Sequence, residues 1–216
     1  MNISRQISSN FLMGDVTSEA AGNGGAGDGP SDQELVRRAQ AGNYEAFDRL
    51  VTRHRGKVYA MIVNMVHNDA DAWDYSQDAF VKAWKALPKF ENRAAFSTWM
   101  FRIAHNVVYD AMRRKKMQSE GELDDSLLNA ESIDSSARTA PRNPARPDEE
   151  MDRHERRDEI DKALKQLSPE HREVIILREV QGLDYAEIAE VMQSTKGTVM
   201  SRLFYARKKL QTLLKP

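Results

Sequence analysis

The sequence has no cysteine and no long apolar run, and each absence excludes a class of protein. Without cysteine, the 216 residues can form neither a disulfide framework nor a thiol redox switch nor a cysteine-ligated zinc site. No stretch approaches the ~20 apolar residues that a membrane span needs, and the N-terminus lacks the basic-then-apolar order of a secretion signal. We therefore expect a cytoplasmic protein that does not insert into a membrane.

Catalytic and metal-binding patterns are also missing from the sequence. It contains no glycine-rich phosphate loop and no nucleophile elbow. The histidines do not have the spacing of metal ligands; they are His54, His67, His105, His154 and His171. The sequence therefore predicts that the protein is not an enzyme and has neither a metal site nor a cofactor.

The net charge of −1 hides an uneven distribution of charged residues. Basic residues cluster at 113–116 and near the C-terminus, whereas residues 118–134 hold six acidic residues and no Lys or Arg. The glycine-rich start predicts a disordered tail over residues 1–30, and the acidic, then proline-spaced stretch 118–151 predicts a flexible linker. Two small domains remain, at 31–117 and 152–216.

The pattern of residues 184–214 predicts two helices joined by a tight turn. Asp184 and Glu187 have the spacing of a capping box at a helix start. The polar run 193–195 interrupts the apolar periodicity and offers an N-cap for a second helix. The apolar residues of that second helix recur at steps of four and three and predict one buried face: Val199, Leu203, Ala206, Leu210 and Leu213.

The opposite face of this second helix is predicted to be basic and exposed. It carries Lys196, Met200, Ser201, Phe204, Arg207 and Lys208. From Gln193 to the end the chain has six Lys or Arg and no acid, on a helix of the diameter that fits a DNA major groove. The pattern favours a DNA-binding helix-turn-helix. The alternative is an ordinary helical hairpin with a solvated basic face.

The segment before residue 117 is predicted to be helical throughout. The first helix is expected to start at an N-cap, Ser31, with Glu34 in the capping-box position, and a break is expected at 42–43. A separate helical element is predicted at 58–66 and another helix after Asn68. The last helix is predicted from Thr98 to Lys116, with Ser97 as its cap. In the last helix the core face is expected to hold Trp99, Ile103, Ala104, Val107 and Ala111.

The basic end of this last helix has two explanations. Cations at a helix C-terminus complement the helix dipole, which needs no ligand. However, the helix follows a polar and aromatic loop at 89–95, and that combination suits stacking and phosphate contact with an unpaired strand.

Several motifs together carry a resemblance to a known family. They are DAWDYSQDAFVKAW, FSTWMFRIAHN, LSPEHREVIILR, and YAEIAEVM followed by GTVMSRLFYARKKL. In this order and at this separation they resemble the bacterial sigma-70 family of initiation factors, specifically the extracytoplasmic-function (ECF) group, which keeps domains two and four. The resemblance implies an all-α protein of two small helical domains.

The resemblance also implies partners and sites. In the family, domain two binds the clamp of the largest subunit of core RNA polymerase; the matching residues are Asp74, Tyr75, Gln77 and Asp78. It also captures and contacts the minus-10 promoter strand; the matching residues are Phe90, Asn92, Arg93, Arg102, Asn106 and Arg113. Domain four enters the major groove at the minus-35 element; the matching residues are Lys196, Thr198, Met200, Ser201, Arg202, Phe204, Arg207 and Lys208. An anti-sigma factor is a further expected partner, because such surfaces must be kept silent.

The chain departs from the family pattern at several positions. Trp73 stands where an acid is usual, the loop 91–93 differs from the common Arg-Gly-acid, and Met200 replaces a usual cation. Without that cation, bidentate recognition of guanine at this position is impossible. In the family the linker threads through the polymerase, and the acidic stretch 120–134 is expected to occupy a basic channel there. The alternatives to a sigma factor are a helix-turn-helix regulator that acts without being a polymerase subunit, and a sigma-like protein that only sequesters a partner.

Overall fold

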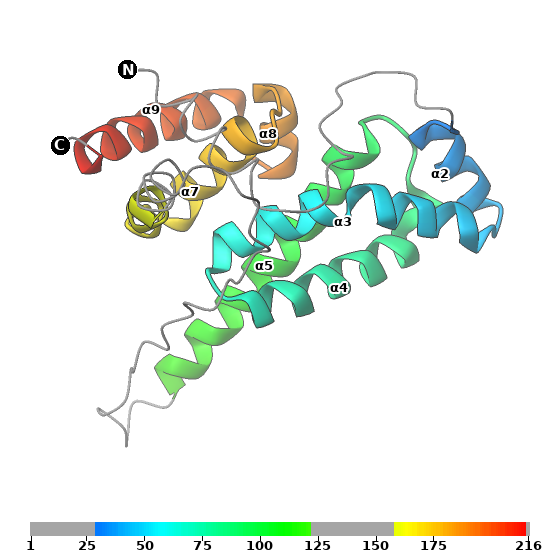
Figure 1. Ribbon diagram of the computed structural model, residues 1–216, viewed down its shortest axis with the longest axis horizontal. Helices are drawn as coiled ribbons and strands as arrows, with labels where there is room; N and C mark the ends of the chain where they lie inside the picture. Colours follow the sequence, from blue (N-terminus) through cyan, green and yellow to red (C-terminus); the bar gives the residue numbers. More distant parts are fainter. Residues whose placement is uncertain (1–28, 122–157, 215–216) are drawn as a thin grey trace, which may run out of the picture.

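The computed structural model describes residues 29–121 and 158–214, and every regular element in these two ranges is a helix (Figure 1). The helices are α2 (Asp32–Gln40), α3 (Tyr44–Val66), α4 (Asp69–Ala86), the short η1 (Leu87–Lys89), α5 (Phe96–Gly121), α7 (Pro169–Ile175), the π-helical η2 (Ile176–Val180), α8 (Tyr185–Val191) and α9 (Lys196–Leu213). Residues 158–165 are also helical and precede α7. The all-α prediction is confirmed. Most of the predicted tail and linker, including the acidic stretch, lies outside the described residues.

Helix starts follow the capping chemistry that the sequence predicts. Asn68 and Thr195 each accept a hydrogen bond from a backbone N–H of the following turn. Ser168, not singled out above, caps α7 in the same way. Asp184 and Glu187 form a complete capping box, and the two backbone N–H groups bonded to Asp184 lower the pKa of its carboxyl group. At Ser31 only half of the expected box forms, because the Glu34 carboxylate pairs instead with Arg37 and Arg38.

Three predicted helix boundaries are wrong. The expected separate element at 58–66 is part of one continuous helix α3, because the single Gly56 does not stop a helix without a second breaker. Helix α5 begins at Phe96, so Ser97 lies inside it rather than at its cap, and α5 continues past Lys116 to Gly121. Apart from these three boundaries, the helix after Pro169 changes to π geometry at Ile176 and ends at Val180, just before Gly182 at φ +73°.

The N-terminal helices form one bundle and the C-terminal helices another. Helix α3 packs against α2, α4 and α5, while α9 packs against α7 and α8. The predicted inner face of α9 is buried at Val199, Leu203, Ala206 and Leu210, and Leu213 is half-buried. Among the described residues no helix has the length and apolar character to cross a membrane.

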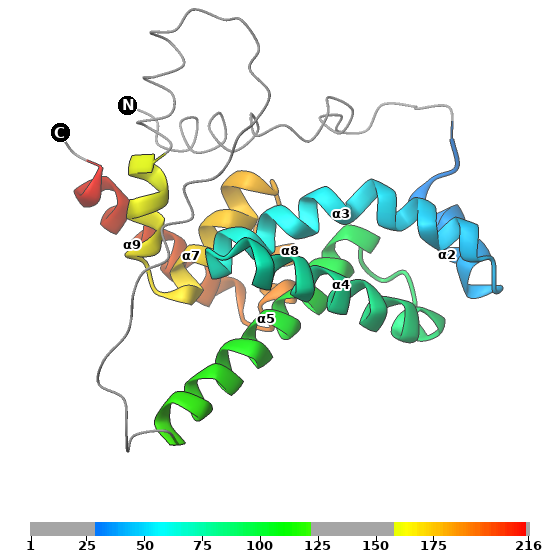
Figure 2. The same ribbon diagram turned by 60° about the horizontal axis from the view of Figure 1, so that its bottom comes forward.

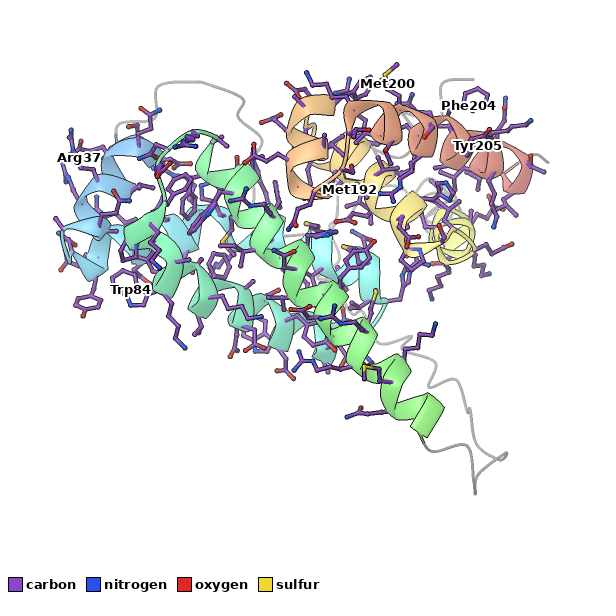
Figure 3. All side chains as sticks on the ribbon, turned by 180° about the vertical axis from the view of Figure 1, so that it is seen from behind. Arg37, Trp84, Met192, Met200, Phe204 and Tyr205 are labelled. Carbon is purple, nitrogen blue, oxygen red and sulfur yellow. The ribbon has the colours of Figure 1, made fainter. Side chains whose placement is uncertain are left out.

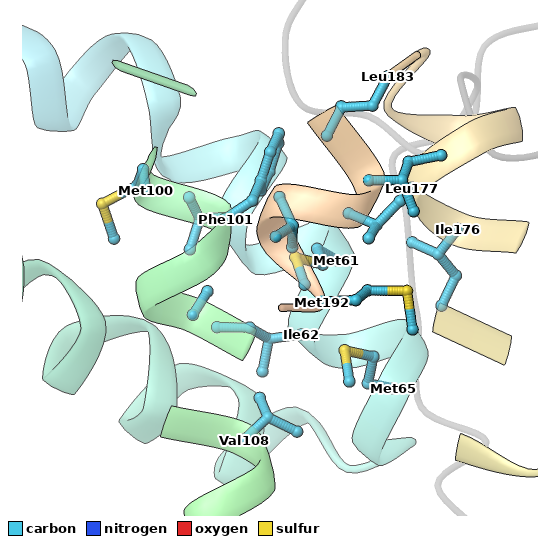
Figure 4. Packing of buried hydrophobic residues seen from close by; sticks show 14 of the residues in the cluster. Met61, Ile62, Met65, Met100, Phe101, Val108, Ile176, Leu177, Leu183 and Met192 are labelled. Carbon is cyan, nitrogen blue, oxygen red and sulfur yellow. The ribbon is translucent and has the colours of Figure 1, made fainter. Parts of the chain in front are cut away.

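The two bundles also share a continuous apolar core. Helix α5 packs against α8, and α3 packs against α7 and η2. Figure 4 shows Met61 and Met65 of α3 and Phe101 of α5 in the same cluster as Leu177 and Met192. This explains why Met100, Phe101 and Val108 are buried in addition to the core face predicted for α5: the helix is covered on two sides.

Candidate nucleic-acid and polymerase interfaces

The outer face of α9 is an exposed surface that mixes cations with large apolar side chains. Met200 and Phe204 are 56% and 62% exposed, and beside them Tyr205 is 59% exposed. Figure 3 shows these three side chains pointing away from the body of the protein. Lys196, Ser201 and Lys208 are also exposed. The face therefore combines cations of the kind that bind phosphate with side chains that can contact a thymine methyl group.

Two predicted members of this face have partners within the protein. The Arg207 guanidinium donates to Glu179 Oε1 over 2.6 Å, and this pairing raises the pKa of Arg207 against the opposing effect of its burial. The Thr198 hydroxyl lies 2.9 Å from the hydroxyl of the N-cap Thr195. Arg202 is half-buried. Arg207 and Thr198 therefore each have to leave an internal interaction to reach a base edge.

The loop between η1 and α5 lines a cavity of about 240 Å³. Phe90 itself is only 8% exposed and stacks on Trp99 with ring centroids 4.6 Å apart, so it forms part of the wall. Asn92 turns the loop at φ +53°, a left-handed conformation that Asn tolerates. Arg93 is exposed and pairs with Glu91 over 2.6 Å. The lining combines two largely buried aromatic side chains with cations and with the acids Glu91 and Glu190, so the cations are the groups that could contact the phosphate of an unstacked nucleotide.

Helix α5 carries the remaining residues predicted for the minus-10 strand. Arg102 also lines the cavity, and Asn106 lies one turn further along the same face. Arg113 is exposed and lies at the start of the last turns of α5, which extend beyond the bundles (Figure 2). Arg113 pairs with Asp110 over 2.9 Å. Two residues further on, Lys115 donates a hydrogen bond to Asp71 of α4 over 2.7 Å, and this bond raises the pKa of Lys115.

The residues predicted to bind polymerase share one face of α4. Asp74, Gln77 and Asp78 are exposed, and Tyr75 is half-buried against the core. Trp73, 59% exposed, precedes Gln77 by one helical turn, and Val81, 52% exposed, follows it by one turn. Val81 did not emerge from the sequence pattern, although two exposed apolar residues flanking acids on one helix face are typical of a docking surface.

The sequence also gave no indication of a set of contacts between the two bundles. Glu173 of α7 is fully buried, and its Oε1 lies 2.6 Å from His105 Nδ1 on α5. The Arg172 guanidinium is buried and donates to the backbone carbonyl of Met65 over 2.8 Å. Burial and the charge of Glu173 raise the pKa of Tyr109. Within residues 29–121 and 158–214, no group of His, Asp or Glu has the arrangement of a metal site.

Comparisons with known proteins identify the family of this chain. Residues 50–117 match the model for sigma-70 region 2, and residues 157–210 match the model for sigma-70 region 4. The chain is 37% identical to the RNA polymerase sigma-H factor of Pseudomonas aeruginosa over 186 residues, which are 86% of this chain and 94% of that protein. It is 35% identical to the ECF RNA polymerase sigma-E factor of Escherichia coli over 189 residues, 86% of this chain and 95% of that protein.

Two solved structures resemble this chain over both bundles. One is the sigma factor RpoE in complex with the anti-sigma factor NepR from Bartonella quintana, with a TM-score of 0.62, 26% identity, and coverage of 79% of this chain and 97% of that one. The other is CnrH in complex with the cytosolic domain of CnrY, with a TM-score of 0.60, 27% identity, and coverage of 85% and 96%. Together with the two matched regions, these relatives place the chain in the sigma-70 family, in its ECF group, as a transcription initiation factor and not an enzyme.

Proposed function

We propose that this chain binds core RNA polymerase through the exposed face of α4 and directs it to promoters with two elements. In this proposal the α5 face and the loop cavity hold the minus-10 strand, and the outer face of α9 enters the major groove at the minus-35 element. The protein then acts in the bacterial cytoplasm, where transcription takes place.

One observation carries the proposal: a single chain presents an acidic and apolar helix face together with a separate cation-bearing recognition helix. The α4 face combines Asp74 and Asp78 with the exposed Trp73 and Val81. Such a face suits another helix pair rather than DNA, because its charge repels phosphate. A regulator that works without polymerase has no need of this surface.

The test is binding to core polymerase followed by transcription. The purified chain is expected to co-elute with core enzyme in gel filtration and to initiate transcripts from genomic DNA at a common set of start sites. Asp78→Lys is expected to abolish co-elution, while Asp48→Lys, the same charge change on an exposed residue of α3, leaves it intact. A chain that footprints duplex DNA alone and ignores core enzyme is a helix-turn-helix regulator instead.

An anti-sigma protein is a further proposed partner. Its support is that both solved relatives were captured in complexes, RpoE with an anti-sigma factor and CnrH with the cytosolic domain of CnrY. In an order-of-addition experiment, such a partner mixed with the chain before core enzyme is expected to prevent co-elution with polymerase. Equal co-elution with and without the partner would reject it as an inhibitor.

A further inference from the structure

One stripe of α5 is fully paired with the C-terminal bundle. Thr98, Arg102 and Asn106 follow each other at steps of four, so they lie on one face of the helix. Their partners are, in the same order, Glu187 Oε1 at 3.0 Å, Glu190 Oε1 at 3.4 Å and the Gln193 side-chain amide at 3.0 Å. His105, on the adjoining edge of the stripe, pairs with buried Glu173.

The partners from α8 present the chemistry of a nucleic-acid backbone. Glu187 and Glu190 are carboxylates, and a carboxylate and a phosphate both satisfy a guanidinium or a hydroxyl donor through charged oxygens. Glu190 also lines the loop cavity, where it faces Arg102 among the cations Lys89 and Arg93. Glu190 therefore lines the site that the proposed function gives to the melted strand.

This paired arrangement and a promoter-bound arrangement exclude each other. Contacts of about 3 Å from the α5 stripe to Glu187 of α8 and to Gln193 in the following turn leave no space for a nucleotide. The positions that give the minus-10 and minus-35 elements their names differ by about 25 base pairs, which is roughly 85 Å along a duplex at 3.4 Å per base pair. Two bundles in direct contact cannot occupy both elements.

We propose that Glu187 and Glu190 form a built-in competitor for the minus-10 strand, which keeps the free chain closed until polymerase separates the two bundles. This inference rests on the proposed function, because it takes the α5 stripe as the strand-binding surface. The closed arrangement is stabilised by the shared apolar core as well as by ion pairs at the surface. Separating the bundles exposes side chains such as Phe101 and Met192, which are 2% and 6% exposed in the closed arrangement. Binding to core enzyme has to offset that cost.

The first measurement is the affinity of the full chain, without polymerase, for a fluorescent single strand of a promoter taken from its own transcript map. Glu190→Arg removes the competitor and places like charges beside Arg102. The control is Glu159→Arg, which makes the same charge change on an exposed residue of the helix at 158–165. Glu190→Arg is expected to tighten strand binding at least fivefold more than Glu159→Arg. Equal affinities of the two variants, or no binding by any variant, would overturn the inference.

The second measurement follows the distance between the bundles, and the absence of native cysteine makes the labelling clean. Spin labels at Lys82→Cys on α4 and Gln211→Cys on α9, both exposed positions, are expected to give a single narrow distance distribution in the free chain. Glu190→Arg is expected to add a longer distance. A distribution unchanged by Glu190→Arg would contradict the competitor role.

Transcription with core polymerase separates this inference from the function on which it rests. The unlabelled parent and Glu190→Arg are expected to support similar transcript levels at saturating core enzyme, because both are then open. Loss of all transcription by the parent refutes the proposed function, whatever the distances show. Normal transcription with equal strand affinities of the two Arg variants refutes only the built-in competitor.

Discussion

The Thr98 hydroxyl of α5 donates a hydrogen bond to the Glu187 carboxylate of α8 over 3.0 Å, and this bond joins the two bundles. The other oxygen of the same carboxylate accepts from the backbone N–H of Asp184 over 2.9 Å and completes the capping box. Glu187 thus fixes the start of α8 and holds α8 against α5. A local folding signal and a long-range contact depend on one side chain.

Replacing Glu187 should therefore affect both roles. Glu187→Ala removes both acceptors and is expected to lower the free energy of unfolding by about 1–2 kcal/mol, the sum of a lost cap and a lost interbundle bond. Glu187→Gln keeps an acceptor oxygen and should cost clearly less. Urea denaturation followed by circular dichroism measures both values. Equal losses in the two variants would mean that the carboxylate charge, and not its hydrogen bonding, supplies the stability.

Arg172 is the residue whose loss should be most damaging to folding. Its buried guanidinium donates to the carbonyls of Leu164, Lys165 and Leu167, near the end of the helix at 158–165, and to Met65 in the other bundle. Arg172→Met leaves these carbonyls without a donor and is expected to cost about 3 kcal/mol or more. Arg172→Lys should recover only part of this loss, because an ammonium cannot form the same fork. Thermal unfolding of both variants checks this order, and a tolerated Arg172→Met would contradict it.

His67 should make the stability of the protein fall in acid. Burial, together with the charges of Arg172 and Lys165, lowers the pKa of His67 to about 4. The unfolded state then binds a proton more readily, so the contribution of neutral His67 is complete above about pH 6.5 and is lost as the pH falls toward 4. Both cations come from the other bundle, so acid should also favour separation of the bundles.

A matched variant isolates this effect. His67 adopts a left-handed conformation, φ +53°, at the C-cap of α3, and Asn is the non-glycine residue that best tolerates it. His67→Asn should therefore keep the fold and flatten the dependence of unfolding free energy on pH between 6.5 and 4. Denaturation series at several pH values give the slope. An unchanged slope in His67→Asn would assign the acid sensitivity to another group.

Features of the fold set by neighbouring residues could be predicted from the sequence, and contacts between distant segments could not. The capping box at Asp184, the N-cap at Asn68 and the inner face of α9 follow from spacing within one or two turns. The pairing of His105 with Glu173 joins residues 68 positions apart, and no spacing rule reaches that far. One signal in the sequence was available: Glu173 stands directly before the apolar run Val174–Leu177, whose side chains are all buried. An acid in that position indicates a buried carboxylate that needs a partner.

The predicted sites show the same limit. The exposure of Met200 and Phe204 follows from the period of α9, and the structure has both on the outer face. The packing of Phe90 on Trp99 and the pairing of Arg207 with Glu179 depend on which helix lies alongside, which the period does not specify. Side chains that the sequence presents as free to bind DNA are in these two cases part of the internal structure.

The exposed Met200 should weaken recognition of guanine at one position of the minus-35 element. A thioether can contact a thymine methyl group but cannot form the two hydrogen bonds by which Arg binds guanine. Met200→Arg is therefore expected to shift preference toward guanine at a single position by about 1–3 kcal/mol, roughly 5- to 150-fold. Lys208→Ala is the control: Lys208 is proposed to bind phosphate, so its removal should weaken binding to all sequences alike and reduce the salt dependence. Transcription from a library randomised across the minus-35 element, with core polymerase present, gives both results. A uniform change of all sequences by Met200→Arg would mean that residue 200 contacts the backbone and not a base.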